Sequence, residues 1–230
     1  MKWWVWDVLD LLYPRICPGC GMPLRRKERI ICLFCLLKLP RTLFKCRSDN
    51  VFEKMLKGRV RIFEASAFLY FAKSGLAQRL MHALKYGGDK ALGIQLGRFF
   101  AEELIKDEQF IKPDLLVSVP LHPDKLSKRG YNQSEMIALG LSEKLGVPYR
   151  NDVLVRVRHT ETQTRKKRFE RWENMKDGFG VEASAGLNKV HIAIVDDVVT
   201  TGATLEVCAE TLHAHLECEV SLFTLCIAIR

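Results

Sequence analysis

The chain has 230 residues, 48% of them hydrophobic, and a formal net charge of +9 at pH 7. A chain of this length can bury one substantial core and a small appendage, so we expect two unequal domains, residues 1–50 and residues 51–230. Asp7 and Asp10 interrupt the longest apolar stretch near the start, and no small-residue cleavage site follows it. These features exclude a transmembrane helix and a signal peptide and predict a cytoplasmic protein.

The positive charge is unevenly spread. Residues 1–50 hold ten Lys or Arg against four acids, and a second basic run over residues 156–176 holds eight Lys or Arg against three Glu. Such basic runs can bind nucleic acid or pyrophosphate, or can only increase solubility. Charge alone does not distinguish these three functions.

The first dozen residues predict an amphipathic helix that ends before Pro14. Trp3, Trp4 and Trp6 lie in it, and an aromatic stripe of this kind usually packs into a core. The alternative is a docking role, at a partner or at the inner face of the membrane.

Two cysteine pairs follow, Cys17-x-x-Cys20 and Cys32-x-x-Cys35, with eleven residues between them. Each pair can hold one tetrahedral ion from a tight turn, so the spacing predicts a structural Zn²⁺ site; reduced free thiols and a redox pair are the alternatives. Four thiolates leave no open position for water, which argues against catalytic zinc. Cys46 has no assigned role.

From residue 62 onward, apolar strand patterns alternate with helical ones. Strands are expected over residues 64–71, 115–119, 153–157, 190–195 and 220–229. Helices are expected from a Ser74 cap to residue 86, and over residues 89–106, 133–145 and 203–215. This alternation is typical of an α/β fold with a doubly wound, mostly parallel sheet.

The apolar strand at residues 190–195 runs directly into two carboxylates, Asp196 and Asp197. Open α/β sheets bind ligands at the carboxyl ends of their strands, and paired carboxylates can accept hydrogen bonds from the vicinal hydroxyls of a ribose. Hydroxyls, backbone N–H groups and a helix start follow and suit a phosphate dianion: Thr200, Thr201, Gly202, Ala203 and Thr204. The alternative is a capped helix after a tight turn, with no ligand.

Taken in order, these motifs resemble the ComF family of type I phosphoribosyltransferases, which includes the ComFC-like and GntX-like proteins and carries an N-terminal zinc-binding module. The resemblance covers nearly the whole chain. Besides the cysteine pairs and residues 190–204, it is carried by residues 84–89, 119–122, 129–134, 156–163 and 171–179.

The resemblance implies binding of 5-phosphoribosyl 1-pyrophosphate (PRPP) and displacement of its pyrophosphate by a nucleophile that the sequence does not reveal. It assigns the 5-phosphate to residues 200–204 and the ribose hydroxyls, as the catalytic pair, to Asp196 and Asp197. Mg²⁺ is expected on the pyrophosphate oxygens and water, with no protein ligand assigned. The acceptor would be recognised by a hood around residues 68–89 and the zinc module, where His82 and Lys85 have no partner evident from the sequence.

The strand at residues 115–119 leads into the expected pyrophosphate loop, Val119, Pro120 and Leu121. Lys125 and Arg129 are the nearby cations. For Arg129 the alternative is an ordinary solvated arginine.

The basic segment over residues 156–174 is expected to be a flexible loop that closes over the site, or a solvated charged helix over residues 164–176. Five of its residues match the family pattern: Arg158, Thr160, Gln163, Arg171 and Asn174.

Two further functions compete with the transferase. One is a single-stranded-DNA-binding competence factor that keeps the PRPP site for regulation, since Phe169 and Trp172 interleave the basic run and could stack bases. The other is a scaffold that docks competence or membrane uptake proteins. DNA binding should weaken steeply with salt, and PRPP binding less so.

Overall fold

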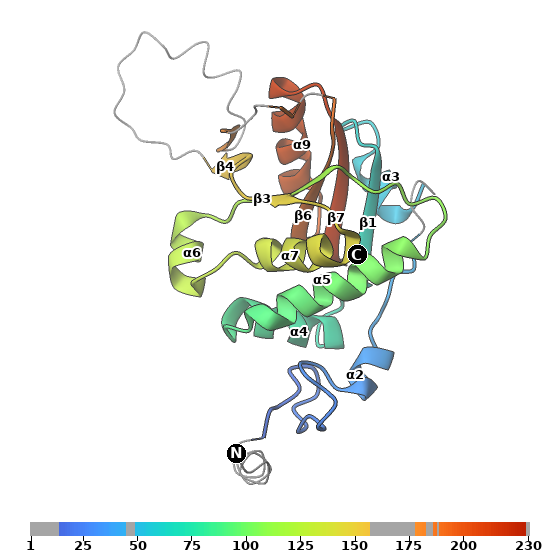
Figure 1. Cartoon of the computed structure of the whole chain (residues 1–230), viewed down its shortest axis with the longest axis vertical. Coiled ribbons are helices and arrows are strands. Elements are labelled where there is room, and N and C mark those ends of the chain that lie inside the picture. Colours follow the sequence, from blue (N-terminus) through green and yellow to red (C-terminus); the bar gives the residue numbers. More distant parts are fainter. Residues whose placement is uncertain (1–13, 45–48, 157–177, 183–185, 188, 229–230) are drawn as a thin grey trace.

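The computed structural model describes residues 14–44, 49–156, 178–182, 186–187 and 189–228 (Figure 1). Its centre is a five-stranded sheet of order β1-β7-β6-β2-β3, in which every neighbouring pair is parallel. The strands are β1 (Glu64–Tyr70), β2 (Leu115–Ser118), β3 (Tyr149–Arg150), β6 (His191–Val199) and β7 (Glu219–Ile227). A separate antiparallel pair joins β4 (Leu154–Arg156) to β5 (Phe179–Val181).

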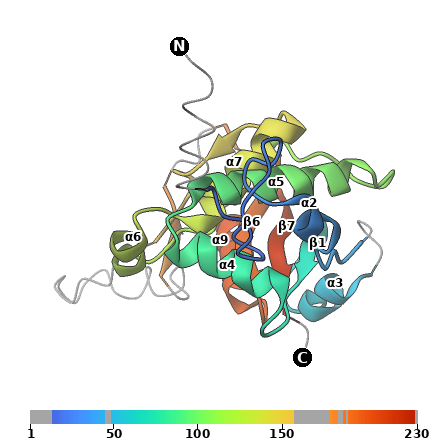
Figure 2. The same cartoon turned by 90° about the horizontal axis from the view of Figure 1, so that it is seen from below.

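Helices cover both faces of this sheet (Figure 2). One core contains the apolar sides of α4 (Leu76–Tyr86), α5 (Lys90–Ile105) and α7 (Gln133–Leu145). The other contains α3 (Val51–Leu56) and α9 (Ala203–His215), while α6 (Pro123–Arg129) carries no buried residue. Alternate residues of β6 enter the two cores, so this strand is buried on both faces and its apolar run needs no polar alternation.

The α/β class with a parallel sheet is therefore confirmed, and most expected elements are found within one or two residues of their bounds. Two expectations were wrong. Ser74 does not cap α4, because Gly75 takes that position and Ser74 has a positive φ of 62°. The strand expected to stop at residue 195 continues to Val199, so both aspartates lie within β6. The strand expected at residues 153–157 is found as β4, which pairs with β5 outside the central sheet.

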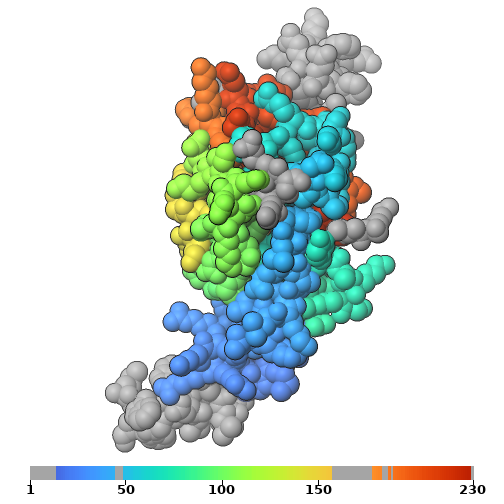
Figure 3. Space-filling model, turned by 90° about the vertical axis from the view of Figure 1, so that its right-hand side faces the viewer, coloured from blue at the N-terminus to red at the C-terminus, as the bar shows by residue number. Residues whose placement is uncertain are grey.

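Residues 14–44 contain α2 (Leu33–Leu37), and Cys17, Cys32, Cys35 and Leu39 share the core of α4 and α5. Residues 40–42, which follow α2, run antiparallel to β1. The Tyr70 N–H donates to the Pro40 carbonyl at 2.8 Å, and the Thr42 N–H donates to the Phe68 carbonyl at 3.0 Å. Figure 3 shows the blue surface of this part continuing upward between green and cyan surfaces. The domain division at residue 50 stays a prediction.

Among the described helices, none combines the length and the apolarity that a bilayer crossing requires.

Helices α5 and α7 approach each other through two glycines. A Cβ atom on Gly140 would overlap the Ile94 carbonyl oxygen, and one on Gly97 would overlap the Ile137 carbonyl oxygen. Both obstacles are backbone atoms, so the helices would have to separate to admit a methyl group. This close contact sets the position of α7, whose first turn reaches the carboxyl edge of the sheet.

We expect Gly140→Ala to lower the free energy of unfolding by about 2–3 kcal/mol, because the added methyl group forces the packed helices apart. Urea denaturation measures the change. Glu102→Ala, at an exposed ion pair on α5 with Lys144, is the matched control and should cost less than about 1 kcal/mol. An equal loss of unfolding free energy in both variants would show that the close glycine contact does not contribute more to stability than an exposed ion pair.

Candidate functional site

The end of β6 and the start of α9 form a strand–loop–helix unit at the carboxyl edge of the sheet. After Val199, Thr200 and Thr201 are exposed, and Gly202 takes a left-handed conformation with a φ of 78° before α9 begins. A Cβ on Gly202 would lie 2.7 Å from Leu56 Cδ2, so both the backbone angle and the packing require glycine here.

The N-terminus of α9 offers backbone N–H groups that could bind a ligand. Gly202, its N-cap, has no side chain to satisfy the first N–H groups, and Thr204 in the first turn is exposed. Arg59 fixes this loop: it donates to the Thr201 carbonyl at 2.8 Å and forms an ion pair with Glu206. The Ala203 N–H donates to Thr201 Oγ1 at a long 3.5 Å, and the remaining first-turn N–H groups at the positive end of this 13-residue helix favour an anion.

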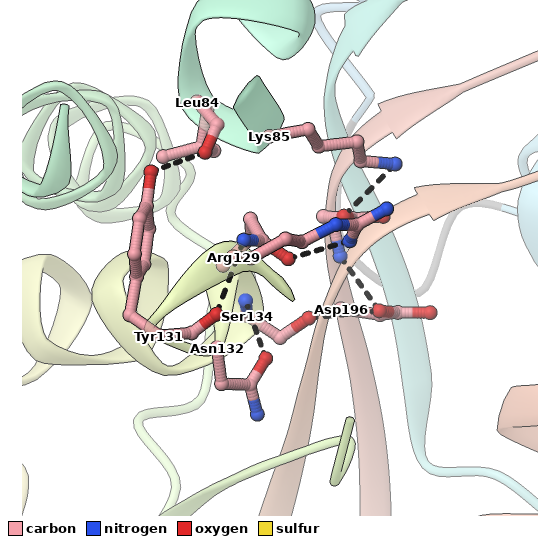
Figure 4. Close-up of polar contacts among 9 residues, drawn as sticks. Leu84, Lys85, Arg129, Tyr131, Asn132, Ser134 and Asp196 are labelled. Carbon is pink, nitrogen blue, oxygen red and sulfur yellow. Dashed lines mark hydrogen bonds and ion pairs between the residues drawn. The ribbon is translucent and has the colours of Figure 1, made fainter. Parts of the chain in front are cut away.

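The two aspartates have different partners (Figure 4). Asp196 Oδ1 accepts hydrogen bonds from the Ser134 hydroxyl at 2.9 Å and from the Asp197 N–H at 2.8 Å. Asp197 Oδ2 lies 3.0 Å from Lys85 Nζ on α4. Helices α4 and α7 thus each supply one contact to the carboxylate pair.

Burial, and next to it repulsion from Asp197, raises the pKa of Asp196 to about 7. The hydrogen bonds from Asp197 N–H and Ser134 and the charge of Lys85 act in the opposite direction but do not outweigh burial. The pair therefore changes its charge near neutral pH.

Ser134 is placed by the residues before it. The Asn132 side chain caps α7 by accepting from the Ser134 N–H at 3.1 Å, and its amide donates to the Val119 carbonyl at 2.9 Å. The Tyr131 hydroxyl donates to the Leu84 carbonyl at the end of α4. This buried network joins α4, α7 and the end of β2 around the aspartates.

The expected pyrophosphate residues are only partly brought together. Val119 is buried beside β6, its N–H donating to the Val195 carbonyl at 2.9 Å, and Pro120 and Leu121 are half-buried. Arg129, at the end of α6, donates to Gln133 at 2.8 Å and lies over the Tyr86 ring, 5.5 Å from its centre.

Lys125 lies on the same helix as Arg129, one turn earlier. It is exposed on α6, which stands away from the sheet in Figure 1. Its role in the site stays a prediction.

Several sequence expectations lie outside the described residues. They are the tryptophan-rich helix, Cys46, and the expected flexible loop with Arg158, Thr160, Gln163, Arg171 and Asn174.

Three contacts of the site were not foreseen. Lys85 was noted without a partner, and the Lys85–Asp197 ion pair depends on the packing of α4 over β6. Arg59 carried no signal at all, because it is 142 residues from Thr201 in sequence. Ser134 lies in a segment, residues 129–134, that carried the family resemblance, although its bond to Asp196 could not be read from sequence.

The four cysteines of the two pairs come together as expected. The sulfur atoms of Cys17, Cys20, Cys32 and Cys35 all lie within 4.8 Å of one another, with 3.6 Å between those of Cys20 and Cys32. Four sulfurs around a tetrahedral Zn²⁺ are about 3.8 Å apart, so the cluster fits a metal such as zinc.

The Cys17 thiol is already disposed to ionise. Burial opposes its ionisation, but backbone N–H groups, with Cys32 foremost, outweigh burial and lower the pKa of Cys17 to about 7. The Cys32 N–H lies 3.4 Å from Cys17 Sγ. A thiolate is the form that binds metal.

Comparisons with known proteins identify relatives. Over 150 residues the chain is 33% identical to the DNA utilization protein YhgH of Salmonella typhi, covering 64% of this chain and 65% of that one. Over 228 residues it is 26% identical to the competence protein ComFC of Bacillus subtilis, covering 96% of this chain and 88% of that one. The chain is therefore similar to competence proteins of the ComF type.

The chain spans slightly less than two thirds of the length of the enterobacterial relatives that it matches. These relatives confirm the resemblance to ComF proteins noted in the sequence. No family model matches the sequence. Among solved structures, the glutamine PRPP amidotransferase from B. subtilis is similar, with 18% identity, a TM-score of 0.45, and coverage of 63% of this chain and 30% of that one.

We expect the purified protein to contain about one zinc ion per chain, and Cys17→Ser to lose most of it because three thiolates bind the ion more weakly. Metal analysis by mass spectrometry measures the content, and chelation should lower the unfolding temperature by ~5 °C or more. Cys218→Ala, a buried thiol outside the cluster, should keep the metal. Full metal content in Cys17→Ser would contradict a four-thiolate site.

A second expectation concerns stability and pH. Since the folded pKa of Asp196 is about 7 against 3.8 for the free group, the folded state keeps a proton that the unfolded state loses between these values. Stability is therefore lost as pH rises through 7. Asp196→Asn should remove this loss. The free energy of unfolding of the variant, compared with that of wild type, should therefore be highest above pH 7 and fall toward pH 4.

The size of the effect is limited by about 1.4 kcal/mol for each pH unit between the two pKa values. Urea unfolding at pH 4 to 9 measures the difference, with Asp152→Asn, an exposed aspartate paired with Arg150, as the control. A difference between Asp196→Asn and wild type that does not grow with pH would count against the raised pKa.

Proposed function

We propose that this protein binds PRPP with Mg²⁺ and transfers its phosphoribosyl group to an acceptor, as part of DNA uptake. The observation that carries the proposal is the junction of an adjacent carboxylate pair, Asp196 and Asp197, with the open N-terminus of α9 after Gly202. Carboxylates and a helix N-terminus on one strand–loop–helix unit match the hydroxyls and the phosphate of a ribose 5-phosphate.

In the proposed complex, the 5-phosphate lies on the backbone N–H groups and hydroxyls of residues 200–204. The ribose 2- and 3-hydroxyls donate to Asp196 and Asp197. Ser134 and the Asp197 N–H both bind Asp196 Oδ1, so the other oxygen, Oδ2, is the one we expect to face the sugar. These contacts align C1 for attack and exclude solvent from one side of the ring.

The transfer forms a bond from the acceptor to C1 and breaks the bond from C1 to the pyrophosphate oxygen, so that pyrophosphate leaves with the bonding electrons. Positive charge develops on the sugar ring, and the nearby carboxylates stabilise it. Mg²⁺, when bound to the pyrophosphate, supplies charge neutralisation for this leaving group. We assign Arg129 and the backbone after Val119 to binding of the pyrophosphate.

The four-cysteine module would hold a structural Zn²⁺ and, through the shared core, position α4. A role in DNA uptake is supported by the relatives, whose names are competence protein and DNA utilization protein. The same names support the second candidate, a single-stranded-DNA-binding competence factor that keeps the sugar-phosphate site for regulation.

We expect PRPP with Mg²⁺ to bind saturably to the wild type, and the double variant Asp196→Asn/Asp197→Asn to weaken binding at least tenfold, because charge-assisted bonds to both hydroxyls become neutral ones. Isothermal titration calorimetry measures both. Gly202→Ala should also weaken binding, since it disturbs the φ of 78° at the phosphate loop.

The control is Gly58→Ala, which changes a glycine of similar φ, 77°, where an added Cβ meets no atom within 4 Å. It should bind PRPP as the wild type does. If folded wild-type protein with metal in its cysteine cluster does not bind PRPP, the transferase is wrong and single-stranded DNA becomes the ligand to test.

A further inference from the structure

Lys85 makes a charge contact with the aspartate pair that the sequence did not predict. Its Nζ lies 3.0 Å from Asp197 Oδ2, and the two side chains are only 23% and 15% exposed. Partial burial makes such a pair electrostatically stronger than one in open solvent, and leaves either charge poorly solvated if the other is removed.

The fold holds Lys85 in this place. It lies in the last turn of α4, whose Leu80, Met81 and Leu84 are buried in the core. The Tyr131 hydroxyl donates to the Leu84 carbonyl, which ties this turn to the start of α7 (Figure 4). The ammonium group therefore faces Asp197 because the helix end is fixed from two sides.

The charges around the pair are few. On β6 itself, Asp196 and Asp197 repel each other. Ser134 of α7 donates a neutral hydrogen bond, and α9 presents the Cys208 thiol, whose own pKa is raised by burial and by Asp196. Strand β7 presents the Cys226 thiol, whose pKa is raised by burial and by Asp197 and lowered by Lys85.

One cation from another element acts on both aspartates, Lys85 of α4. Arg156 of β4 acts on Cys208 of α9. Among the described residues, Lys85 is the one cation in an ion pair with either aspartate.

We propose that Lys85 is a positioning residue for the sugar site: its ammonium group lowers the pH above which Asp196 and Asp197 are both ionised, so that both can accept hydrogen bonds from the ribose hydroxyls. This assignment rests on the proposed function. A protonated carboxyl group donates rather than only accepts, so a pair that shares one proton binds two hydroxyl donors less well.

Loss of Lys85 would make the second ionisation of the pair harder. An opposite charge within 4–6 Å lowers a carboxyl pKa by about 1–3 units, and the two aspartates titrate as a coupled system. We therefore expect the titration of the pair to move upward by about one pH unit or more when Lys85 becomes neutral. A merely structural role, bridging α4 to β6, would weaken binding equally at every pH.

The test compares wild type, Lys85→Met and Lys85→Arg, with ribose 5-phosphate as the titrant at pH 5.5 to 9. This probe has no pyrophosphate, so a direct contact between Lys85 and pyrophosphate cannot contribute. Protonation of its phosphate is common to all three proteins, and differences among them report on the protein. The matched control is Lys90→Met, a lysine at the start of α5 that lies over the Tyr131 ring.

We expect Lys85→Met to bind about fivefold more weakly than wild type near pH 7, about tenfold more weakly at pH 5.5, and within about twofold of it at pH 9, where the pair is ionised in both. Lys85→Arg should restore the wild-type profile, and Lys90→Met should leave it unchanged. A loss in Lys85→Met of the same factor at all pH values, or no loss, would overturn the proposal.

A second measurement needs no ligand. Carboxyl ¹³C shifts in protein labelled at aspartate follow the ionisation of the pair directly, and its midpoint should rise by about one pH unit in Lys85→Met. An unchanged midpoint would overturn the assignment of Lys85 alone. Absence of ribose 5-phosphate and PRPP binding in the wild type would instead remove the proposed function, and with it the role of Lys85 in sugar binding.

Discussion

Two adjacent carboxylates on one strand repel each other, and the rest of the site is arranged around this repulsion. Asp196 receives hydrogen bonds on one oxygen, and Asp197 receives the charge of Lys85. The side-chain partners, Ser134 and Lys85, lie on different helices. The pair is therefore stable only while the last turn of α4 and the first turn of α7 both lie at the carboxyl edge of β6.

The positions of those helix ends come from close packing farther away. Gly97 and Gly140 let α5 and α7 approach to backbone contact, which brings the first turn of α7 and its Ser134 to β6. Asn132 then links α7 to the end of β2, and Tyr131 links it to α4. Small residues in the core and polar residues at the helix ends thus act together on the carboxylates.

The local signals in the sequence were strong enough to predict the fold class, the cysteine cluster and most elements. Helix α7 was predicted at its observed bounds, because Asn132 is an N-cap and Gly146 a left-handed C-cap. The Ser74 cap failed because serine and glycine are neighbours there and the chain turns at Ser74.

The contacts made across the molecule could not be predicted. Lys85 with Asp197, Ser134 with Asp196 and Arg59 with Thr201 join residues 62 to 142 positions apart, and no periodicity or spacing encodes such pairs.

The pairing of residues 40–42 with β1 has a consequence beyond the site. β1 is the outer strand of a five-stranded sheet, and an uncovered outer strand presents free N–H and C=O groups to other chains. The segment that leaves the cysteine module occupies part of this edge, with the Tyr70 N–H and the Phe68 carbonyl already bonded to it. The chain that follows the cysteine module thus also protects the sheet from edge-to-edge association with a second molecule.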